Sequence, residues 1–573
     1  MDLLTALQIE VILNINFGKN IKLINSRLQG SYNFFLNNYR EYTAMQFFIR
    51  LFEGFSLLNT VLTVLAFLVV GFIYRIFIKP FFQIRAYKNI PGVLVTYKIG
   101  TKAIWEHKNS VGEPLEFDED SPFYRTENNT LLLKYPNLKA IVTNLAHNPH
   151  ITIIDHNLTA EIIKNPDYYM NFLRNTMFGK VYGRYAMIFS TPAVWKRQRK
   201  VISGAFDFDS MRKIMPIIQE VAKEFFENET FTNGKEPQAL QQFFLAYTWE
   251  ALSRSFFGDD LKNFTPGGEP FSKIINAFVK RQFSIFMSLQ YQIFGNTAAL
   301  WNSTIRRERK RLFELGKFVE NMVEIISGRI KRGELKNADG RKGILELILE
   351  NSNENDSLTN MELMGNFFGF SFAGTDTSSN TASNLLYCLA ANPEIKQKVI
   401  EDIQTHWDGQ SPLTPEILNK IEYLHASLLE TLRVMSPVPF LLPRVAIRDH
   451  MIGDIPIKKG YLVQAYFSPT LFSPWWIKNP EQFQPERWIK GREAYQQLED
   501  VFIFNPFSFG PRNCIGQHFA MTQMKIAMCY FLPRFEFSLP PDFKLSPMVR
   551  RATMEPREPI KMFIKPKSNW KKN

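Results

Sequence analysis

The sequence predicts a mainly α-helical protein with small β-sheets, preceded by one transmembrane helix. Three observations predict this class: an uncharged apolar stretch over residues 55–74, a helical pattern of about 30 residues that follows Thr359, and strand-like runs that are only short, such as 140–144 and 150–155. Of the 573 residues, 45% are apolar and 21% are charged. This balance supports a large buried core and excludes a disordered chain.

The apolar stretch has about the length that a helix needs to cross the hydrocarbon layer, and we assign residues 55–78 to a transmembrane anchor. Residues 1–54 form an N-terminal extension before it, which is unlike the layout of a cleaved secretory signal. Basic residues follow the stretch, at Arg75, Lys79, Arg85, Lys88 and Lys98, and the first acidic residue after it is Glu106, so the positive-inside tendency predicts that the rest of the chain is cytosolic. The alternative is a helix buried in the core.

Proline and glycine separate the anchor from the remaining chain. Pro80, Pro91 and Gly92 predict a stiff hinge over residues 79–92. Beyond it we find no internal repeat, low-complexity tract or long linker, so residues 93–573 are expected to form one large domain.

Charge and cysteine content narrow the class of partner. The net charge is +13, but basic and acidic residues alternate without a compact basic module, so nucleic acid is not an expected partner. A diffuse basic surface suits an anionic membrane or an acidic protein, or is simply a solvated surface. The three cysteines, Cys388, Cys514 and Cys529, have no short paired spacing, which argues against disulfides and a cysteine-built zinc site.

The most distinct helix has recognisable ends. Thr359 and Glu362 have the spacing of a capping box, and Pro393 marks the end of the pattern. Its middle is apolar almost all round, which predicts a helix that runs through the core. A second helix is expected over residues 424–435, and helices dominate from about Asp209 onward.

The segment 507–516, FSFGPRNCIG, predicts a tight loop that displays one thiol. Gly510 and Pro511 turn the chain, and Gly516 permits a planar partner to come close to the backbone. A helix that starts near Ile515 would direct backbone N–H groups at the sulfur of Cys514 and favour its thiolate form. An inert core cysteine is the alternative.

The spacing of Phe507, Gly510, Arg512, Cys514 and Gly516 resembles the haem-binding signature of the cytochrome P450 family. The resemblance implies the fold of that family, with a long central helix over the haem. It also implies that Cys514 is the proximal thiolate ligand to the iron of haem b.

Further motifs occur in the order of that family. On the long helix, Ala373, Gly374, Thr375, Asp376 and Thr377 resemble the oxygen-binding motif. The small side chains would leave space beside a flat cofactor, and Asp376 with Thr377 would relay protons as a catalytic acid-alcohol pair. A helix made locally polar for packing is the alternative.

Two further sets of residues resemble structural and cofactor-binding positions of the family. Glu430, Arg433 and Arg487 resemble its buried Glu-Arg-Arg triad, to which we give a structural role. The remaining positions are expected to contact the haem propionates, and they are Trp195, Arg199, Arg444 and Arg512. For residues 196–200 a solvated basic helix is the alternative.

The resemblance implies a monooxygenase that inserts one atom of O2 into an apolar lipid, sterol, fatty acid or xenobiotic. No dinucleotide fingerprint is apparent, so electrons from NADPH would come through a separate cytochrome P450 reductase, with cytochrome b5 as a further candidate partner. The expected location is the endoplasmic reticulum membrane, with a single span. The alternatives are a haem-thiolate isomerase or dehydratase of oxygenated lipids, and a non-enzymatic membrane haem sensor.

Overall fold

The computed structural model divides the chain into two compact units, Met1–Arg75 and Ile76–Asn573. The N-terminal extension predicted over residues 1–54 lies outside the described part of the chain. The structure describes residues 57–99, 102–107, 137–145, 148–171, 174, 177–228, 234–257, 274, 277–278, 281–282, 284–285, 288–333, 342–352, 356–467, 471–472, 477–491, 504–546, 548–550 and 553–567.

One helix in the described residues is long and apolar enough to cross a membrane, as the sequence predicted. It covers Val61–Arg85, and its most apolar 18-residue window has a mean hydropathy of 2.5 and is 6% buried. The helix comprises α4 (Leu57–Ile73), a π-helical turn (Tyr74–Ile78) and α5 (Lys79–Arg85). We expected the helix to end before Pro80, and this expectation is wrong. Pro80 occupies the first turn of α5, where a missing N–H group costs little.

The second half of the predicted hinge is a tight turn. Gly92 has a φ of +75°, and an added Cβ would lie 2.5 Å from the carbonyl oxygen of Asn137, so this position requires glycine. The backbone N–H of Lys139 donates to the Gly92 carbonyl at 2.8 Å. This bond leads the chain directly into the first sheet.

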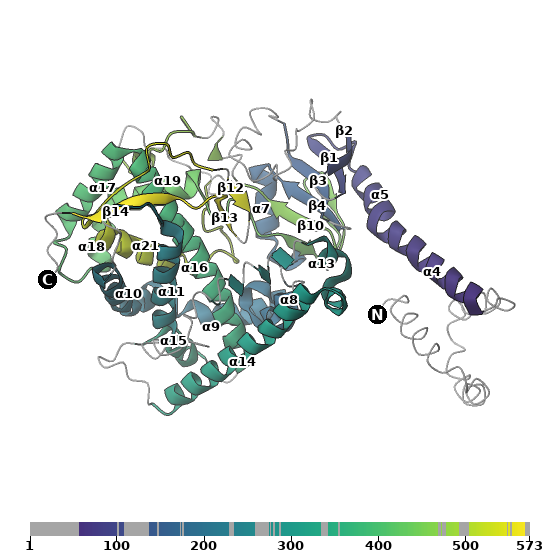
Figure 1. Ribbon diagram of the computed structural model, residues 1–573, viewed down its shortest axis with the longest axis horizontal. Coiled ribbons are helices and arrows are strands. Elements are labelled where there is room, and N and C mark those ends of the chain that lie inside the picture. Colours follow the sequence, from purple (N-terminus) through teal and green to yellow (C-terminus); the bar gives the residue numbers. More distant parts are fainter. Residues whose placement is uncertain are drawn as a thin grey trace. The chain divides into compact units, whose positions relative to one another are not determined.

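Helices make up most of the second unit in its described part (Figure 1). Their bounds are α7 (His156–Lys164), α8 (Met177–Val181), α9 (Pro192–Ser203), α10 (Phe208–Asn228), α11 (Leu240–Phe257), α13 (Leu289–Phe294), α14 (Ser303–Lys331), α15 (Ile344–Glu350), α16 (Asn360–Ala391), α17 (Pro393–His406), α18 (Pro415–Lys420), α19 (Glu422–Val434) and α21 (Gln517–Phe531).

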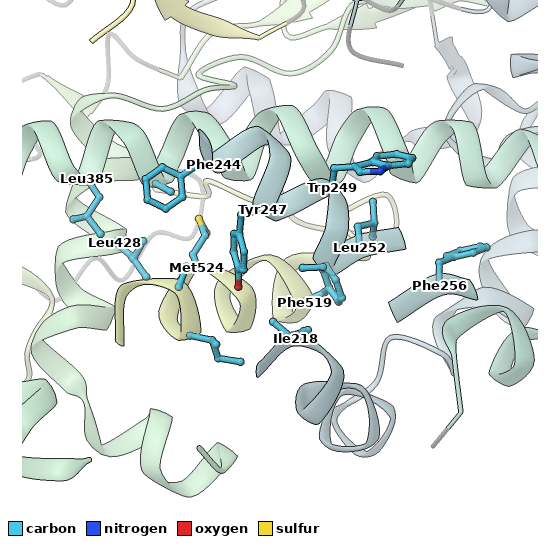
Figure 2. Packing of buried hydrophobic residues seen from close by; sticks show 14 of the residues in the cluster. Ile218, Phe244, Tyr247, Trp249, Leu252, Phe256, Leu385, Leu428, Phe519 and Met524 are labelled. Atoms are coloured by element: carbon cyan, nitrogen blue, oxygen red, sulfur yellow. The ribbon is translucent and has the colours of Figure 1, made fainter. Parts of the chain in front are cut away.

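The long helix α16 is the centre of the core, and its predicted start is confirmed. The Thr359 side chain accepts a hydrogen bond from the Glu362 N–H, and the Glu362 carboxylate accepts one from the Thr359 N–H, which completes the capping box. Figure 2 shows Tyr247 and Leu252 of α11 among the packed side chains between α16 and α21. Tyr247 also donates to the backbone carbonyl of Gln523 in α21 at 3.0 Å, so its hydroxyl is satisfied although the residue is fully buried.

The largest sheet has seven strands in the order β2-β1-β3-β4-β10-β7-β5. The β1–β3 and β4–β10 pairs are parallel, and the other pairs are antiparallel. The strands are β1 (Val93–Ile99), β2 (Lys102–His107), β3 (Ala140–Leu145), β4 (Asn148–Ile153), β5 (Tyr169–Asn171), β7 (Arg444–Ala446) and β10 (Leu462–Ala465). The strands predicted over residues 140–144 and 150–155 are therefore confirmed as β3 and β4.

Three smaller sheets complete the described strands. They are β11 (Phe535–Ser538), β14 (Lys561–Pro566) and β6 (Gln238–Ala239); β12 (Met548–Arg550) with β13 (Met554–Pro556); and β8 (His450–Ile452) with β9 (Ile455–Ile457). The mainly helical architecture with small sheets is thus as the sequence predicted.

Candidate active site

A cavity of about 340 Å³ lies between α16 and the loop that precedes α21. Most of its wall is apolar, with Leu252, Phe370 and Phe440 among the side chains. The residues that the sequence singled out and that line this cavity are Trp195, Arg199, Ala373, Gly374, Thr377, Arg444, Phe507, Arg512, Cys514 and Gly516. Elements far apart in the chain therefore bring these positions to one place.

Hydrogen bonds within the cysteine loop fix its shape. The Cys514 N–H donates to the Phe507 carbonyl at 2.8 Å, and the Asn513 N–H donates to the Gly510 carbonyl at 3.1 Å. Gly510 has a φ of +74°, and a Cβ there would lie 3.0 Å from Ile163 Cγ2, so this glycine serves the turn and the packing on α7 without lining the cavity. The following helix begins at Gln517, two residues later than predicted.

Among the three cysteines, only Cys514 lines the cavity. Cys514 is exposed toward the cavity, but the surrounding protein desolvates the thiol and raises its pKa, while a hydrogen bond from the Gly516 backbone and the guanidinium of Arg199 act in the opposite direction. A cation bound at this thiol, such as a metal ion, would favour its thiolate form. Cys388 and Cys529 are buried in the core, where burial also raises their pKa values.

Four residues predicted to contact an anionic group form part of the same wall. The Arg512 guanidinium lies 4.4 Å from the centroid of the Trp195 ring. Arg199 donates to the carbonyl and side-chain oxygens of Asn513 at 2.9 and 2.7 Å, and so it braces the loop beside Cys514.

Arg444 is the most exceptional of the four. Its Nη1 is buried with no hydrogen-bond partner among the described residues. Burial and the neighbouring charge of Arg512 lower the pKa of Arg444 to about 10. A buried guanidinium nitrogen without a partner in the described part of the chain, influenced by a second positive charge, suits an anion beside it.

These features fit a haem. Its propionates would accept hydrogen bonds from Nη1 of Arg444 and would balance the charge of Arg512, and a thiolate at Cys514 would ligate the iron. A Cβ added at Gly516 would meet nothing within 4 Å, so the wall beside Cys514 is open to a flat group. The residues present therefore match a planar, anionic, thiolate-ligated cofactor.

On α16, the predicted acid-alcohol pair faces two directions. Thr377 lines the cavity one turn beyond Ala373, and its hydroxyl donates to the Ala373 carbonyl at 2.7 Å. Asp376 does not line the cavity, and its Oδ2 accepts a hydrogen bond from Thr553 Oγ1 at 2.5 Å. Gly374 lines the cavity, and a Cβ there would be in ordinary van der Waals contact with Leu252 Cδ2, 3.4 Å away.

Sequence reasoning missed several cavity residues. Thr381 lies one helical turn after Thr377 and also lines the cavity, so the helical period could have identified it. Asn366, on the same helix, lines the cavity closer to the start of α16. Sequence reasoning also missed Thr553, which does not line the cavity but contacts Asp376. The two residues are 177 positions apart in the chain, so no local sequence pattern predicts their contact.

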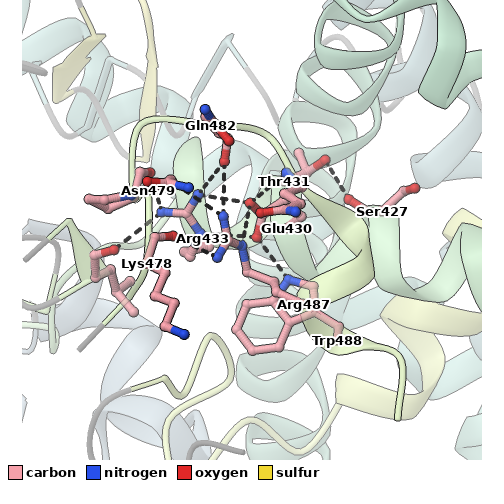
Figure 3. A network of polar contacts seen from close by, with 12 residues as sticks. Ser427, Glu430, Thr431, Arg433, Lys478, Asn479, Gln482, Arg487 and Trp488 are labelled. Carbon is pink, nitrogen blue, oxygen red and sulfur yellow. Dashed lines mark hydrogen bonds and ion pairs between the residues drawn. The ribbon is translucent and has the colours of Figure 1, made fainter. Parts of the chain in front are cut away.

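The residues of the predicted triad meet outside the cavity, in the network that Figure 3 shows. Glu430 Oε1 lies 2.8 Å from Arg433 Nη2 and 3.0 Å from Arg487 Nε, and all three side chains are buried. Arg433 also donates to the Pro480 carbonyl at 2.6 Å. The network thereby fixes the segment before the cysteine loop, and Trp488, which the sequence did not single out, donates to Glu430 Oε2 at 2.8 Å.

Comparisons with known proteins agree with this geometry. The sequence model described as "Cytochrome P450" matches residues 139–563. Cytochrome P450 3A7 of Homo sapiens is 29% identical over 400 residues, which cover 68% of this chain and 77% of that protein. Cytochrome P450 3A6 of Oryctolagus cuniculus is 27% identical over 426 residues, which cover 73% of this chain and 83% of that protein.

Proposed function

Because this chain belongs to the cytochrome P450 family and is a haem-thiolate monooxygenase that takes electrons from a reductase, we propose that its substrate is a small, largely apolar molecule and its electron source NADPH. The overall reaction would convert RH, O2, NADPH and H⁺ to ROH, water and NADP⁺. The observation that carries the proposal is that Cys514 and Thr377, from two different elements, line one mainly apolar cavity.

Haem b, when bound, supplies the activation and transfer of oxygen. Cys514 would ligate its iron, and Arg444 and Arg512 would bind its propionates beside Trp195. Ala373 would leave space for the cofactor and substrate in the cavity because its side chain is a single methyl group. The role of Arg199 would be to hold the cysteine loop through Asn513 as well as to face the cofactor.

Protons would reach the cavity along α16. The Thr377 hydroxyl is the group that would hold a proton at the cavity wall, and Asp376 would supply protons from the neighbouring, protein-filled side of the helix. If this supply fails, the same electrons reduce O2 to hydrogen peroxide, with O2, NADPH and H⁺ giving H2O2 and NADP⁺. The ratio of product to NADPH consumed therefore measures proton delivery.

The cavity wall supports an apolar substrate. Phe206, Phe370 and Phe440 contribute aromatic surface, and Leu252 and Val438 contribute aliphatic surface. Such a wall selects shape and low polarity, so lipids, sterols, fatty acids and xenobiotics all fit the proposal.

We further propose a single-pass anchor in the endoplasmic reticulum membrane with the catalytic unit in the cytosol. The apolar helix Val61–Arg85 and the basic residues that follow the apolar stretch support this orientation. In sealed microsomes, added protease should digest the catalytic unit without detergent. Glycans at the sequons of Asn128 or Asn157 would contradict this orientation.

Reconstitution with cytochrome P450 reductase tests the proposed reaction. NADPH-dependent hydroxylation of a lipid, steroid or xenobiotic from a mixed substrate panel is the expected result, and added cytochrome b5 would test the second partner. Conversion of a lipid hydroperoxide to a rearranged product without NADPH, together with no NADPH-dependent product, would instead favour the isomerase alternative.

A further inference from the structure

The side of α16 that faces away from the cavity carries a contact with the C-terminal hairpin of β12 and β13. Adjacent residues on a helix point about 100° apart, so Asp376 and Thr377 do not face the same way. The Asp376 carboxylate lies against Thr553, the residue immediately before β13, with 2.5 Å between Asp376 Oδ2 and Thr553 Oγ1. Asp376 is 6% and Thr553 4% exposed. A buried bond between a hydroxyl and a carboxylate at this distance belongs to the stronger class of hydrogen bonds.

A second contact fixes the direction of the Thr553 hydroxyl. Asn380, one turn after Asp376 on α16, donates from Nδ2 to Thr553 Oγ1 at 2.8 Å. Because the Thr553 oxygen accepts on this side, its single proton is directed at Asp376. The helix thus holds both ends of the contact, and the hairpin supplies the hydroxyl between them.

The contact is part of a longer buried chain. Gln241, in the first turn of α11, donates from Nε2 to Asn380 Oδ1 at 2.5 Å and to Glu555 Oε2 at 2.5 Å. Glu555 lies on β13, two residues after Thr553, and is 1% exposed. Two of the links are amides, which donate hydrogen bonds without ionising, so the chain suits orientation better than proton conduction.

We propose that Thr553 is a positioning residue for Asp376, which holds the carboxylate in one orientation and thereby supports its passage of protons toward Thr377. The inference rests on the proposed role of Asp376 and Thr377 in proton supply. Without the hydroxyl, the buried carboxylate loses a donor and turns to other partners or to water. Proton delivery would then be slower relative to electron delivery, and a larger share of the electrons would reduce O2 to hydrogen peroxide.

The substitution Thr553→Val removes the hydroxyl and keeps the shape of the side chain. In the reconstituted full-length enzyme, product per NADPH should fall by about fivefold and hydrogen peroxide should rise, a small part of the roughly hundredfold or more that a positioned proton donor contributes. Thr553→Ser should restore the ratio. Thr553→Ala provides a second variant without the hydroxyl and should match Thr553→Val.

Two controls separate positioning from damage to the fold. An organic hydroperoxide supplies oxygen without NADPH, so the conversion of RH and R′OOH to ROH and R′OH should proceed at the wild-type rate in Thr553→Val. Ser546 lies before the same hairpin, and its hydroxyl forms hydrogen bonds with the backbone of Glu558, which lies after the hairpin. Ser546→Ala removes this hydroxyl and should keep the wild-type ratio of product to NADPH. Equal loss of the hydroperoxide reaction in Thr553→Val would overturn the positioning role.

Asp376→Asn distinguishes failure of this inference from failure of the proposed function. We expect Asp376→Asn to uncouple the enzyme and Thr553→Val to add nothing in the double variant, because both act through the same carboxylate. Wild-type coupling in Asp376→Asn would refute the role of Asp376 itself. If Asp376→Asn is uncoupled while Thr553→Val keeps wild-type coupling, only the role of Thr553 is refuted. The same conclusion follows if the effects of the two substitutions multiply in the double variant.

Discussion

At the scale of single residues, the hydroxyl of Thr377 on α16 is expected to control how much product forms per NADPH. Thr377 lines the cavity, whereas Thr375 on the same helix is buried away from it and donates to the Ser371 carbonyl. Thr377→Ala should lower product per NADPH by about tenfold and raise hydrogen peroxide, because a proton donor is lost at the cavity. Thr375→Ala is the matched control and should remain coupled. Wild-type coupling in Thr377→Ala would contradict the assignment.

A second residue-scale prediction concerns His425 on α19. Burial, together with the charge of Lys525, lowers the pKa of His425 to about 4, so the folded protein keeps this imidazole neutral. The unfolded chain takes up the proton near pH 6.5, so the free energy of unfolding should fall as the pH drops from about 6.5 toward 4, by up to about 3 kcal/mol.

Comparison with His425→Leu isolates this contribution from the carboxylates. Denaturant unfolding of both proteins at several pH values should show a steeper loss of stability in the wild-type protein over this pH range. Equal pH dependence of the two proteins would show that His425 does not contribute.

At the scale of elements, the polar network of Figure 3 joins α19 to the segment before the cysteine loop. Glu430→Gln would leave Arg433 and Arg487 buried without their counter-charge, and removal of one partner from a buried ion pair costs about 3–5 kcal/mol. We therefore expect Glu430→Gln to lose bound haem at a lower denaturant concentration than the wild-type protein, as measured by the haem absorbance. Glu422→Gln changes an exposed acid in the first turn of the same helix and should behave as wild type.

The elements that sequence reasoning predicted well are those with local signals. The capping box at Thr359 and Glu362 predicted the start of α16, and uncharged apolar residues predicted the apolar helix that begins with α4. Contacts between distant segments carry no such signal: β4 pairs with β10 about 300 residues later in the chain, and Asp376 meets Thr553. Pro80 misled the prediction because the position of a proline within a helix decides whether the helix ends there.

At the scale of the whole molecule, net charge bears on the electron partner. The chain carries +13, which suits an acidic reductase and predicts an association that weakens as salt screens the charges. The NADPH-dependent rate at limiting reductase should fall between low and physiological ionic strength, while the rate with an organic hydroperoxide should not. A parallel fall of both rates would locate the salt effect in the enzyme itself rather than in its partner.

The central claim, that Cys514 ligates the iron, is tested most directly by the carbon monoxide difference spectrum of the reduced protein. The wild-type protein and the variants Cys388→Ala and Cys529→Ala should all show the spectrum of thiolate-ligated haem, because those two cysteines lie in the core away from the cavity. Cys514→Ala should lose it. A thiolate spectrum that persists in Cys514→Ala, or a nitrogen- or oxygen-ligated spectrum in the wild-type protein, would contradict the account.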